Sequence, residues 1–244
     1  MEFLDEIINI LNTGNTGMVI DKITSFLDEN PQYKIINYYH FANPLEEILF
    51  DIYVEKITDV NQLSLDEPLD EIYHIYAIAY NAEREFDLAE KYLKIANQIN
   101  PVSAPILMRI CEFYQERHSE EKLKSYVCDI FKYAYDVEIL ISNYFKLADY
   151  LFHSQKNMEL YEHLLNFFMF LKSGEAEKSV REDIEYLKDN NVPIGVNREI
   201  INILLYLIDL HTKHEMMASA DYFKKILMEV SQFTETLFKI ENEG

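Results

Sequence analysis

Residues 73–101 read YHIYAIAYNAEREFDLAEKYLKIANQINP, and their apolar spacing is that of two helices joined by a short polar turn. Tyr73, Tyr76 and Tyr80 stand at i, i+3 and i+7, which places the three rings on one helical stripe. Such a stripe predicts packing in the core and between helix pairs. The alternative is that some of the rings line a binding groove, since tyrosine offers a large contact area at low entropy cost.

The two predicted helices, residues 69–82 and 86–98, carry small residues at positions where the helices would face each other. Two antiparallel helices approach closely only where small residues face each other. We therefore expect Ala77 on the first helix to face Ala89 and Ala96 on the second. The aromatic side chains would then fill the space between this pair and the next.

This pattern resembles the tetratricopeptide repeat, in which W-x2-L-G-x2-Y is followed by A-x3-F and then by P. Tyr76 departs from the leucine of that pattern. The resemblance implies antiparallel helix pairs stacked as a right-handed α-solenoid. The positions that match the pattern in type or in bulk, and that we expect to pack the repeat, are Tyr73, Ala77, Tyr80, Ala89, Leu93, Ala96 and Pro101.

Weaker copies of the same size pattern lie on both sides of this unit. An offset of 34 residues gives a second copy at Leu107, Ile110, Cys111, Tyr114, Leu123, Val127 and Ile130. A further offset of 37 gives a third at Tyr144, Leu147, Ala148, Leu151, Leu160, Leu164 and Phe167. A degenerate first copy fits residues 3–31, and residues 204–230 hold a last helical pair whose register the pattern does not fix.

Helical spacing extends over almost the whole chain, so we predict an all-α fold of about 11–13 helices. Neither of the two best candidate breaks, residues 61–68 and 190–195, has the composition of a flexible linker. We therefore expect residues 1–244 to form a single domain. Besides the pair above, helices are expected within residues 3–11, 19–27, 32–41, 45–59, 102–117, 119–134, 137–153, 156–172, 175–189, 196–213 and 215–240.

The charge of the chain is strongly acidic, with 22 Lys and Arg against 43 Asp and Glu. A net charge of −21 repels phosphate, so we expect no binding of nucleic acid or of an anionic membrane. Residues 1–70 hold 3 basic and 14 acidic groups, about half of the excess, whereas residues 71–173 hold 11 and 15. Residues 174–244 hold 8 and 14. The acidic first segment either keeps the protein in solution or steers a basic partner.

Signals for export or membrane insertion are not evident in the sequence. The first residues are acidic where a signal or transit peptide is basic, and no uncharged run reaches 18 residues. Cys111 and Cys128 are too few for a disulfide framework. We therefore expect a cytoplasmic protein with two reduced thiols.

Motifs for catalysis and cofactor binding are also missing. The chain has neither of the Gly-rich phosphate-binding motifs and no Gly-x-Ser-x-Gly. His211, His214 and Glu215 are the one local group with metal-ligand spacing, and they are interpreted either as a solvated pair near a helix end or as a metal site. We predict no catalytic residue, no metal and no cofactor, and a protein that is not an enzyme.

The resemblance implies a concave groove, lined by the first helix of each pair, that holds a peptide from a partner. The groove positions carried over unit by unit are Glu71, His74, Ile78 and Asn81, then Met108, Glu112 and Gln115, then Phe145, Asp149 and Phe152. In one well-known variant of the family, Lys, Arg and Asn hold the terminal carboxylate of the partner. Here acids, amides and apolar groups occupy those positions and favour a peptide with basic and apolar side chains.

Three classes of function follow from this sequence. The first is a noncatalytic protein–protein interaction module in the cytosol. The second is a peptide-sensing regulatory array, which would act through protein contacts because the acidic first 70 residues cannot serve as a DNA-binding helix-turn-helix. The third is a helical-array enzyme or metal-binding protein at His211, His214 and Glu215. The sequence does not identify the partner, the pathway or the oligomeric state.

Overall fold

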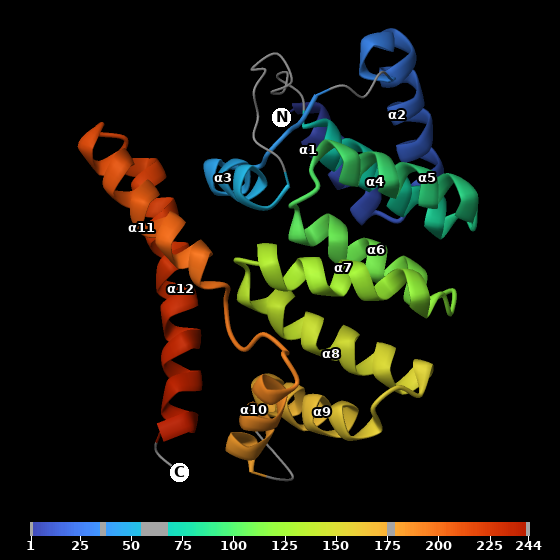
Figure 1. The fold of residues 1–244 in the computed structure, drawn as a ribbon. Coiled ribbons are helices and arrows are strands. Elements are labelled where there is room, and N and C mark those ends of the chain that lie inside the picture. The colour runs from blue at the N-terminus through green and yellow to red at the C-terminus, as the bar shows by residue number, and fades with distance from the viewer. Residues whose placement is uncertain (1, 35–37, 55–67, 175–178, 243–244) are drawn as a thin grey trace. The chain divides into compact units, whose positions relative to one another are not determined.

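The computed structural model describes residues 2–34, 38–54, 68–174 and 179–242. Within these ranges the chain forms twelve α-helices and one 3-10 helix, and neighbouring helices pack as antiparallel pairs (Figure 1). The prediction of an all-α fold is thus confirmed, while the stacking of the pairs as a right-handed solenoid stays a prediction. The chain divides into two compact units, Met1–Ile110 and Cys111–Gly244, and the single domain likewise stays a prediction.

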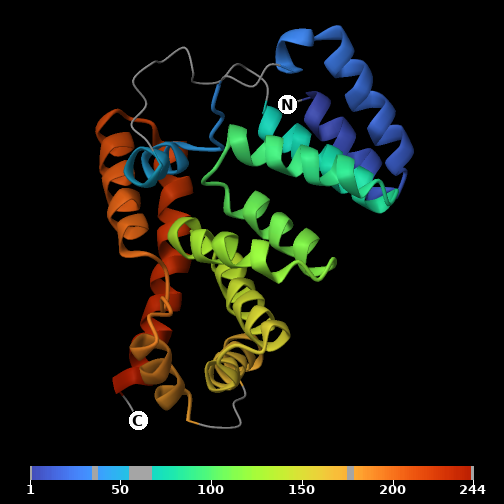
Figure 2. The ribbon, with the colours of Figure 1, turned by 45° about the vertical axis from the view of Figure 1, so that its right-hand side comes forward.

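The first unit is built around one helical hairpin. Its α4 packs against α5, while α1 and α2 pack against the other side of α4, an arrangement that Figures 1 and 2 both show. The bounds of its elements are α1 (Glu2–Asn12), α2 (Thr16–Glu29), η1 (Pro31–Lys34), α3 (Pro44–Tyr53), α4 (Leu69–Ala82) and α5 (Phe86–Ile99).

Helices α4 and α5 pack against each other through the small residues that the sequence pattern predicts for this contact. Ala77, Ala89 and Ala96 are almost fully buried, as the close approach of two helices requires. Tyr73 and Leu93 are buried as well, while Tyr80 and Pro101 keep part of their surface in solvent.

The tyrosine stripe of α4 packs in the core. The Tyr76 ring lies 4.3 Å from that of Tyr92 on α5, and its hydroxyl lies 2.7 Å from the Thr24 hydroxyl on α2. Tyr73 stacks on the same Tyr92 ring at 5.8 Å and donates a hydrogen bond to the Tyr33 carbonyl. These contacts agree with core packing and not with a groove lining for Tyr73 and Tyr76.

The segment after α2 departs from the predicted helix over residues 32–41. Pro31–Lys34 form the single turn η1, and residues 38–43 run without helix into α3. Aromatic packing accounts for this path, because the Tyr39 ring lies 4.5 Å from Phe50 on α3. The His40 amide also donates to the Ile99 carbonyl at the end of α5, 3.1 Å away.

The second unit starts within α6 and contains two further helical hairpins. Helix α8 pairs with α9, and α11 pairs with α12, which also contacts α8 and α10 (Figures 1 and 2). Helix α7 packs on α8, and α10 packs on α9. The bounds are α6 (Ala104–Gln115), α7 (Glu120–Tyr133), α8 (Val137–Ser154), α9 (Met158–Ser173), α10 (Val180–Asp189), α11 (Arg198–Lys213) and α12 (Met217–Asn242).

One turn geometry recurs at the spacing that the sequence copies predict. Arg84, His118 and Gln155, at intervals of 34 and 37 residues, each have a positive φ, of 65°, 50° and 52°. In each turn the next amide donates back to a carbonyl five residues earlier, as from Glu85 to Tyr80. Such a left-handed residue ends a helix and satisfies its last carbonyl groups. These three turns therefore lie where the copies of the sequence pattern place a turn, while the repeat itself stays a prediction.

Four predicted segments fall partly outside the described residues. The parts outside are residues 35–37 of the helix expected at 32–41, the C-terminal part of the helix expected at 45–59, most of the break at 61–68 and the start of the helix expected at 175–189. The other break, residues 190–195, is a connecting segment between α10 and α11, as expected.

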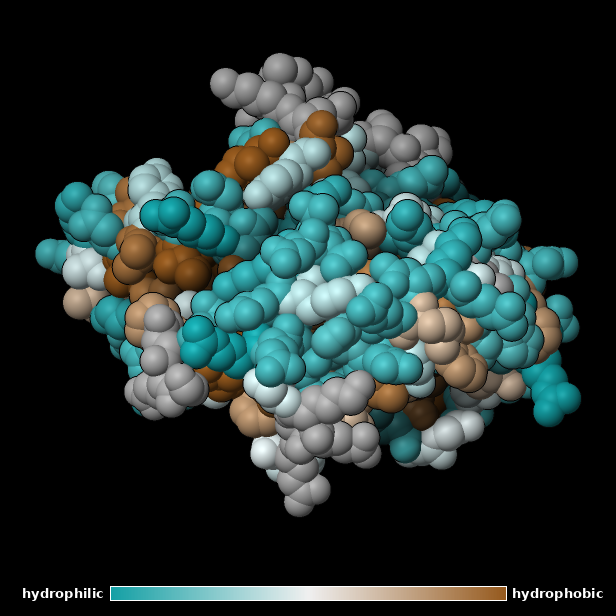
Figure 3. Space-filling model, turned by 60° about the horizontal axis from the view of Figure 1, so that its bottom comes forward, coloured by the Kyte–Doolittle hydropathy of each residue, from teal (hydrophilic) through white to brown (hydrophobic). Residues whose placement is uncertain are grey.

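No helix in the described part of the chain is long and apolar enough to span a membrane. The face drawn in Figure 3 is covered mainly by hydrophilic residues, with separate hydrophobic areas between them. This surface fits a chain in which acids outnumber bases almost two to one.

Candidate functional site

The predicted groove positions of the first unit lie on α4, and they are only half-buried. Glu71, His74, Ile78 and Asn81 all keep part of their surface in solvent. The fifth position, Met108 on α6, is 8% exposed and therefore belongs to the core. Whether the four on α4 contact a partner stays a prediction.

His74 is held in its neutral form. Burial lowers the pKa of its imidazole to about 4, and the positive charge of Arg109 adds to this effect. Its Nε2 atom is buried and has no hydrogen-bond partner among the described residues. An uncharged ring with a buried nitrogen does not attract a basic peptide.

In the second unit, the predicted groove residues of α6 and α8 lie side by side. Gln115 donates a hydrogen bond to Asp149 Oδ2 over 2.6 Å, and Lys146 donates to the side-chain oxygen of Gln115. His153 Nδ1 lies 3.4 Å from the other oxygen of Asp149. Asp149 is therefore already hydrogen-bonded within the protein, and whether it also pairs with a basic side chain of a peptide stays a prediction.

Two aromatic side chains flank Asp149 on the same face of α8. Phe145 is 39% exposed and Phe152 is 49% exposed, and their spacing of seven residues places both on one stripe. Phe145 contacts the Phe168 ring at 5.1 Å and Phe152 contacts the Tyr161 ring at 5.3 Å, both on α9. We call Phe145, Asp149, Phe152 and these two α9 rings the α8 aromatic face.

A buried cluster of acids in the first unit is a candidate site that the sequence did not reveal. Glu46 on α3 and Asp70 on α4 are each 1% exposed. The side-chain amide of Asn100, itself fully buried, donates to both carboxylates, at 2.9 Å and 3.0 Å. His40 Nδ1 lies 2.5 Å from Asp70 Oδ1.

The cluster ties four segments of the first unit together. Glu46 also accepts the Ala42 amide at 2.9 Å, so the segment before α3, α3 itself, α4 and the end of α5 all meet here. Burial disfavours protonated His40, but the bond to Asp70 and the charges of Asp70, Glu71 and Glu46 outweigh it and raise the pKa of His40. Burial, followed by the charge of Asp70, also raises the pKa of Glu71. The internal hydrogen bonds make this cluster a structural clasp.

Metal binding finds no support in the described part of the chain, where no group of three or more His, Cys, Asp or Glu side chains is placed to hold a metal ion. The two histidines at the C-terminal end of α11 have different surroundings. His211 is buried, with its Nδ1 2.7 Å from the Leu207 carbonyl, whereas His214 is exposed at the end of the helix. Glu215 is exposed in the following turn.

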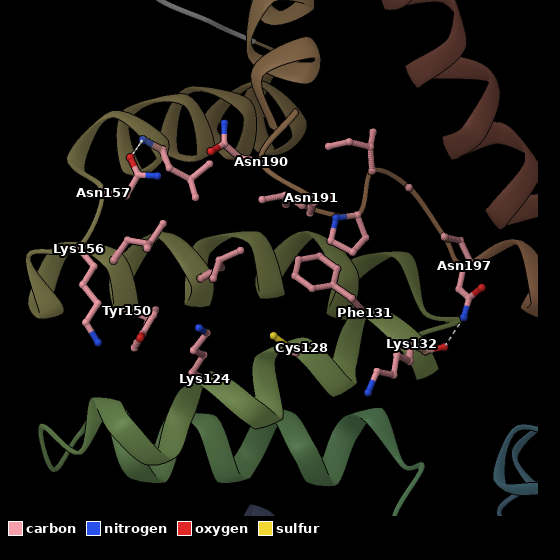
Figure 4. Close-up of a pocket in the computed structure, with 18 of the residues that line it drawn as sticks. Lys124, Cys128, Phe131, Lys132, Tyr150, Lys156, Asn157, Asn190, Asn191 and Asn197 are labelled. Carbon is pink, nitrogen blue, oxygen red and sulfur yellow. Dashed lines mark hydrogen bonds between the residues drawn. The ribbon is translucent and has the colours of Figure 1, made fainter. Parts of the chain in front are cut away.

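A pocket with a volume of about 870 Å³ lies wholly within the second unit. Its walls come from α7, α8, the first turn of α9 with the residues before it, and the segment of residues 190–198 (Figure 4). Apolar side chains form much of the wall, among them Phe131, Leu151, Leu160 and Val192. We call this cavity the α7–α8 pocket.

A buried tyrosine holds the segment that closes this pocket. The Tyr144 hydroxyl on α8 donates to the Pro193 carbonyl at 2.9 Å and accepts the Gly195 amide at 3.0 Å. Asn197 donates from its side chain to the Lys132 carbonyl on α7, 2.9 Å away. Gly195 has a φ of +79°, a conformation that glycine adopts without strain. The wall is thus fixed by side-chain and backbone contacts.

The charged side chains that line the α7–α8 pocket all have the same sign. Lys124, Lys132, Lys156 and Arg198 line it, and no Asp or Glu is found among its described lining residues. Figure 4 shows Lys124 and Lys156 toward one end and Lys132 toward the other, with Cys128 and Phe131 between them. This site has no signal in the sequence, because its cations come from three separate segments of an acidic chain.

The two cysteines of the second unit have different environments. Cys128 is exposed and lines the pocket, whereas Cys111 is buried. Burial raises the pKa of the Cys111 thiol to about 12, which keeps it protonated and unreactive.

Comparison of the chain with models of known families, with curated proteins and with solved structures finds no match. The fold and the geometry of the sites are therefore the basis for a functional assignment.

Proposed function

We propose that this protein is a noncatalytic interaction module that binds a peptide or protein segment along the α8 aromatic face. The observation that carries the proposal is the exposure of Phe145 and Phe152, one on each side of Asp149. Large aromatic side chains are enriched at the centres of protein interfaces and are depleted from ordinary surfaces. Their position on the first helix of a hairpin agrees with the groove that the repeat resemblance implies.

Contacts within the protein hold the side chains of this face in place before a partner binds. Each exposed ring contacts an aromatic ring of α9, so its position is restricted before a partner arrives. The bond from Gln115 to Asp149 links α6 to α8 in the same region. A surface that is ordered in advance loses little conformational entropy on binding.

The partner segment that fits best carries apolar side chains with basic groups beside them. The apolar groups would cover Phe145 and Phe152, and Glu112 on α6 would offer a carboxylate to a Lys or Arg. Asp149 holds Gln115 in place and adds negative charge, while Lys146 offsets part of it.

The test is affinity capture from native lysate with variants of the face. Phe145→Ser with Phe152→Ser removes both rings, and we expect the captured partner to fall at least tenfold, a loss typical of two interface anchors. Tyr206→Ser, at an exposed ring on α11, is the matched control and should leave capture unchanged. Equal capture by the double variant and the control would contradict the proposal.

A second pair of variants tests the role of charge. Glu112→Lys reverses the carboxylate that we assign to the partner, and we expect weaker capture and a smaller dependence on salt. Asp149→Asn keeps the side-chain shape but removes its charge. If partner binding were unchanged by both variants, a basic segment would be the wrong partner.

A further inference from the structure

We propose that the α7–α8 pocket is a binding site for a small amphipathic anion, a molecule with an apolar body and a carboxylate or similar anionic group. The pocket is a second site, separate from the α8 aromatic face. Leu147, Tyr150 and Leu151 line it, and their positions lie on the opposite side of α8 from Phe145 and Phe152. The proposal therefore stands or falls independently of the proposed function.

The size and lining of the pocket fit a small molecule. Its volume of about 870 Å³ falls within the range of small-molecule sites, which are mostly apolar with a few polar groups at fixed places. The floor is rigid, because Phe131 and Leu151 are buried and packed. The closing segment is fixed by the two bonds of Tyr144.

The charge of the rim selects an anion. In a chain where acids outnumber bases almost two to one, four cations and no described acid surround this cavity. Lys132 is paired with Asp129 at 2.6 Å, and Lys156 lies 5.9 Å from the centre of the Tyr150 ring. Lys124 and Arg198 have no ion-pair partner among the described residues, so their charges are available to a ligand.

Three of the four asparagine side chains that line the pocket are already hydrogen-bonded within the protein. The Asn157 side chain caps α9 by accepting the Leu160 amide, and the Asn190 side chain donates to the Tyr186 carbonyl. The Asn197 side chain caps α11 and donates to the Lys132 carbonyl. Besides the Asn191 side chain and the Tyr150 hydroxyl, the cations are therefore the polar side chains that are left to recognise a ligand, and they alone carry charge.

The first experiment compares two ligands with the same alkyl chain and opposite charge, dodecanoate and dodecyltrimethylammonium, both below their micelle concentrations. The net charge of −21 favours the cation at every ordinary surface of this protein, and only the local charge of the pocket favours the anion. By calorimetry we expect one dodecanoate per chain, bound at least tenfold more tightly than the ammonium compound. Equal or tighter binding of the ammonium compound would overturn the proposal.

The second experiment locates the bound anion through Cys128. Neutral iodoacetamide should alkylate Cys128 in the native protein, while Cys111 stays unmodified as an internal control. We expect saturating dodecanoate to slow the alkylation of Cys128 at least fivefold. An unchanged rate with bound dodecanoate would place the ligand elsewhere and would also overturn the proposal.

The third experiment removes the charges. Lys124→Glu with Arg198→Glu should weaken dodecanoate at least tenfold, since each exposed charge contributes a small factor and both are reversed. Lys225→Glu with Lys239→Glu, on α12 and outside the pocket, makes the same change in net charge and should stay within twofold of wild type. If the pocket variant also stayed within twofold, the rim would not recognise the anion. Should that variant fail to fold, the comparison of ligands on the wild-type protein still decides.

Discussion

Asn100 shows how much of the first unit depends on one side chain. Its amide group has two N–H donors, and each is bonded to a buried carboxylate, on Glu46 and on Asp70. Without them both carboxylates would remain buried with a hydrogen bond fewer, and a buried charge that loses a donor is costly.

We expect Asn100→Ala to lower the free energy of unfolding by about 2–4 kcal/mol, the cost of leaving charged acceptors short of a donor. Chemical denaturation followed by circular dichroism measures this change. Gln98→Ala, at an exposed position of α5, is the control and should change stability by less than about 0.5 kcal/mol. A similar small effect for both variants would show that the clasp does not stabilise the unit.

His74 gives a pH dependence whose sign is fixed by its surroundings. Burial and Arg109 lower its pKa to about 4 in the folded protein, against 6.5 for an unperturbed histidine. As the pH falls from 6.5 toward 4, the unfolded chain takes up a proton that the folded chain does not. The free energy of unfolding therefore falls over this range.

We expect His74→Gln to lose less stability than the wild type between pH 6.5 and 4, because the variant lacks this titration. Urea denaturation at several pH values gives the difference between the two proteins, which cancels the titration of other groups. Parallel pH profiles for the two proteins would mean that His74 titrates normally in the folded state.

At the scale of the elements, three turns between helices share one backbone geometry. The chain has only 5 glycines, and Arg84, His118 and Gln155 adopt the left-handed conformation that glycine adopts most easily. This conformation disfavours β-branched residues most strongly.

Substitutions at Arg84 test this geometry. We expect Arg84→Val to lower the free energy of unfolding by about 1–2 kcal/mol, because a branched Cβ clashes in the left-handed region. Arg84→Gly removes the strain and should be neutral or stabilising by less than about 1 kcal/mol. Thermal and chemical unfolding of the two variants should therefore differ clearly, and equal stability would contradict the left-handed turn.

The sequence predicted the helices best where local pattern alone determines them. The hairpin of α4 and α5 begins and ends within one residue of its expected bounds, because its period, its alanines and its polar turn all agree. The same reasoning was wrong for the described part of residues 32–41, because Tyr39 and His40 are held by contacts with Phe50 and Ile99. Such contacts over long sequence distances leave no periodic signal.

The sites also differ in how far the sequence predicts them, because contacts between segments far apart in the sequence leave no periodic signal. Phe145 and Phe152 were proposed from the repeat register and do lie exposed on one stripe of α8. The α7–α8 pocket was not predicted, since Tyr144 bonds a segment about 50 residues away to close it. The clasp of Glu46, Asp70 and Asn100 also joins residues from three separate elements.

At the scale of the whole molecule, the net charge of −21 opposes the compact state through self-repulsion. Salt screens repulsion between exposed charges over about 10 Å at 0.1 M. We expect the melting temperature to rise by several degrees between about 20 mM and 300 mM sodium chloride. Differential scanning calorimetry measures the change, with sucrose at matched osmolality as the uncharged control. A melting temperature that is independent of salt would show that the acidic groups do not repel one another appreciably.

The exposed aromatic side chains of α8 are the feature on which the assignment as an interaction module depends. Their exposure would be a liability in a protein without a partner, because contiguous exposed apolar surface promotes association.

The most direct measurement is site-specific photocrosslinking in the native lysate. A photoreactive phenylalanine analogue replaces Phe152 in one sample and Tyr206 in another, both of which are about half exposed. We predict that the probe at position 152 forms one dominant crosslinked complex, which disappears when excess unlabelled wild-type protein competes for the partner. Crosslinking at position 206 that equals or exceeds that at position 152, or a complex that competition does not remove, would contradict binding at the α8 aromatic face.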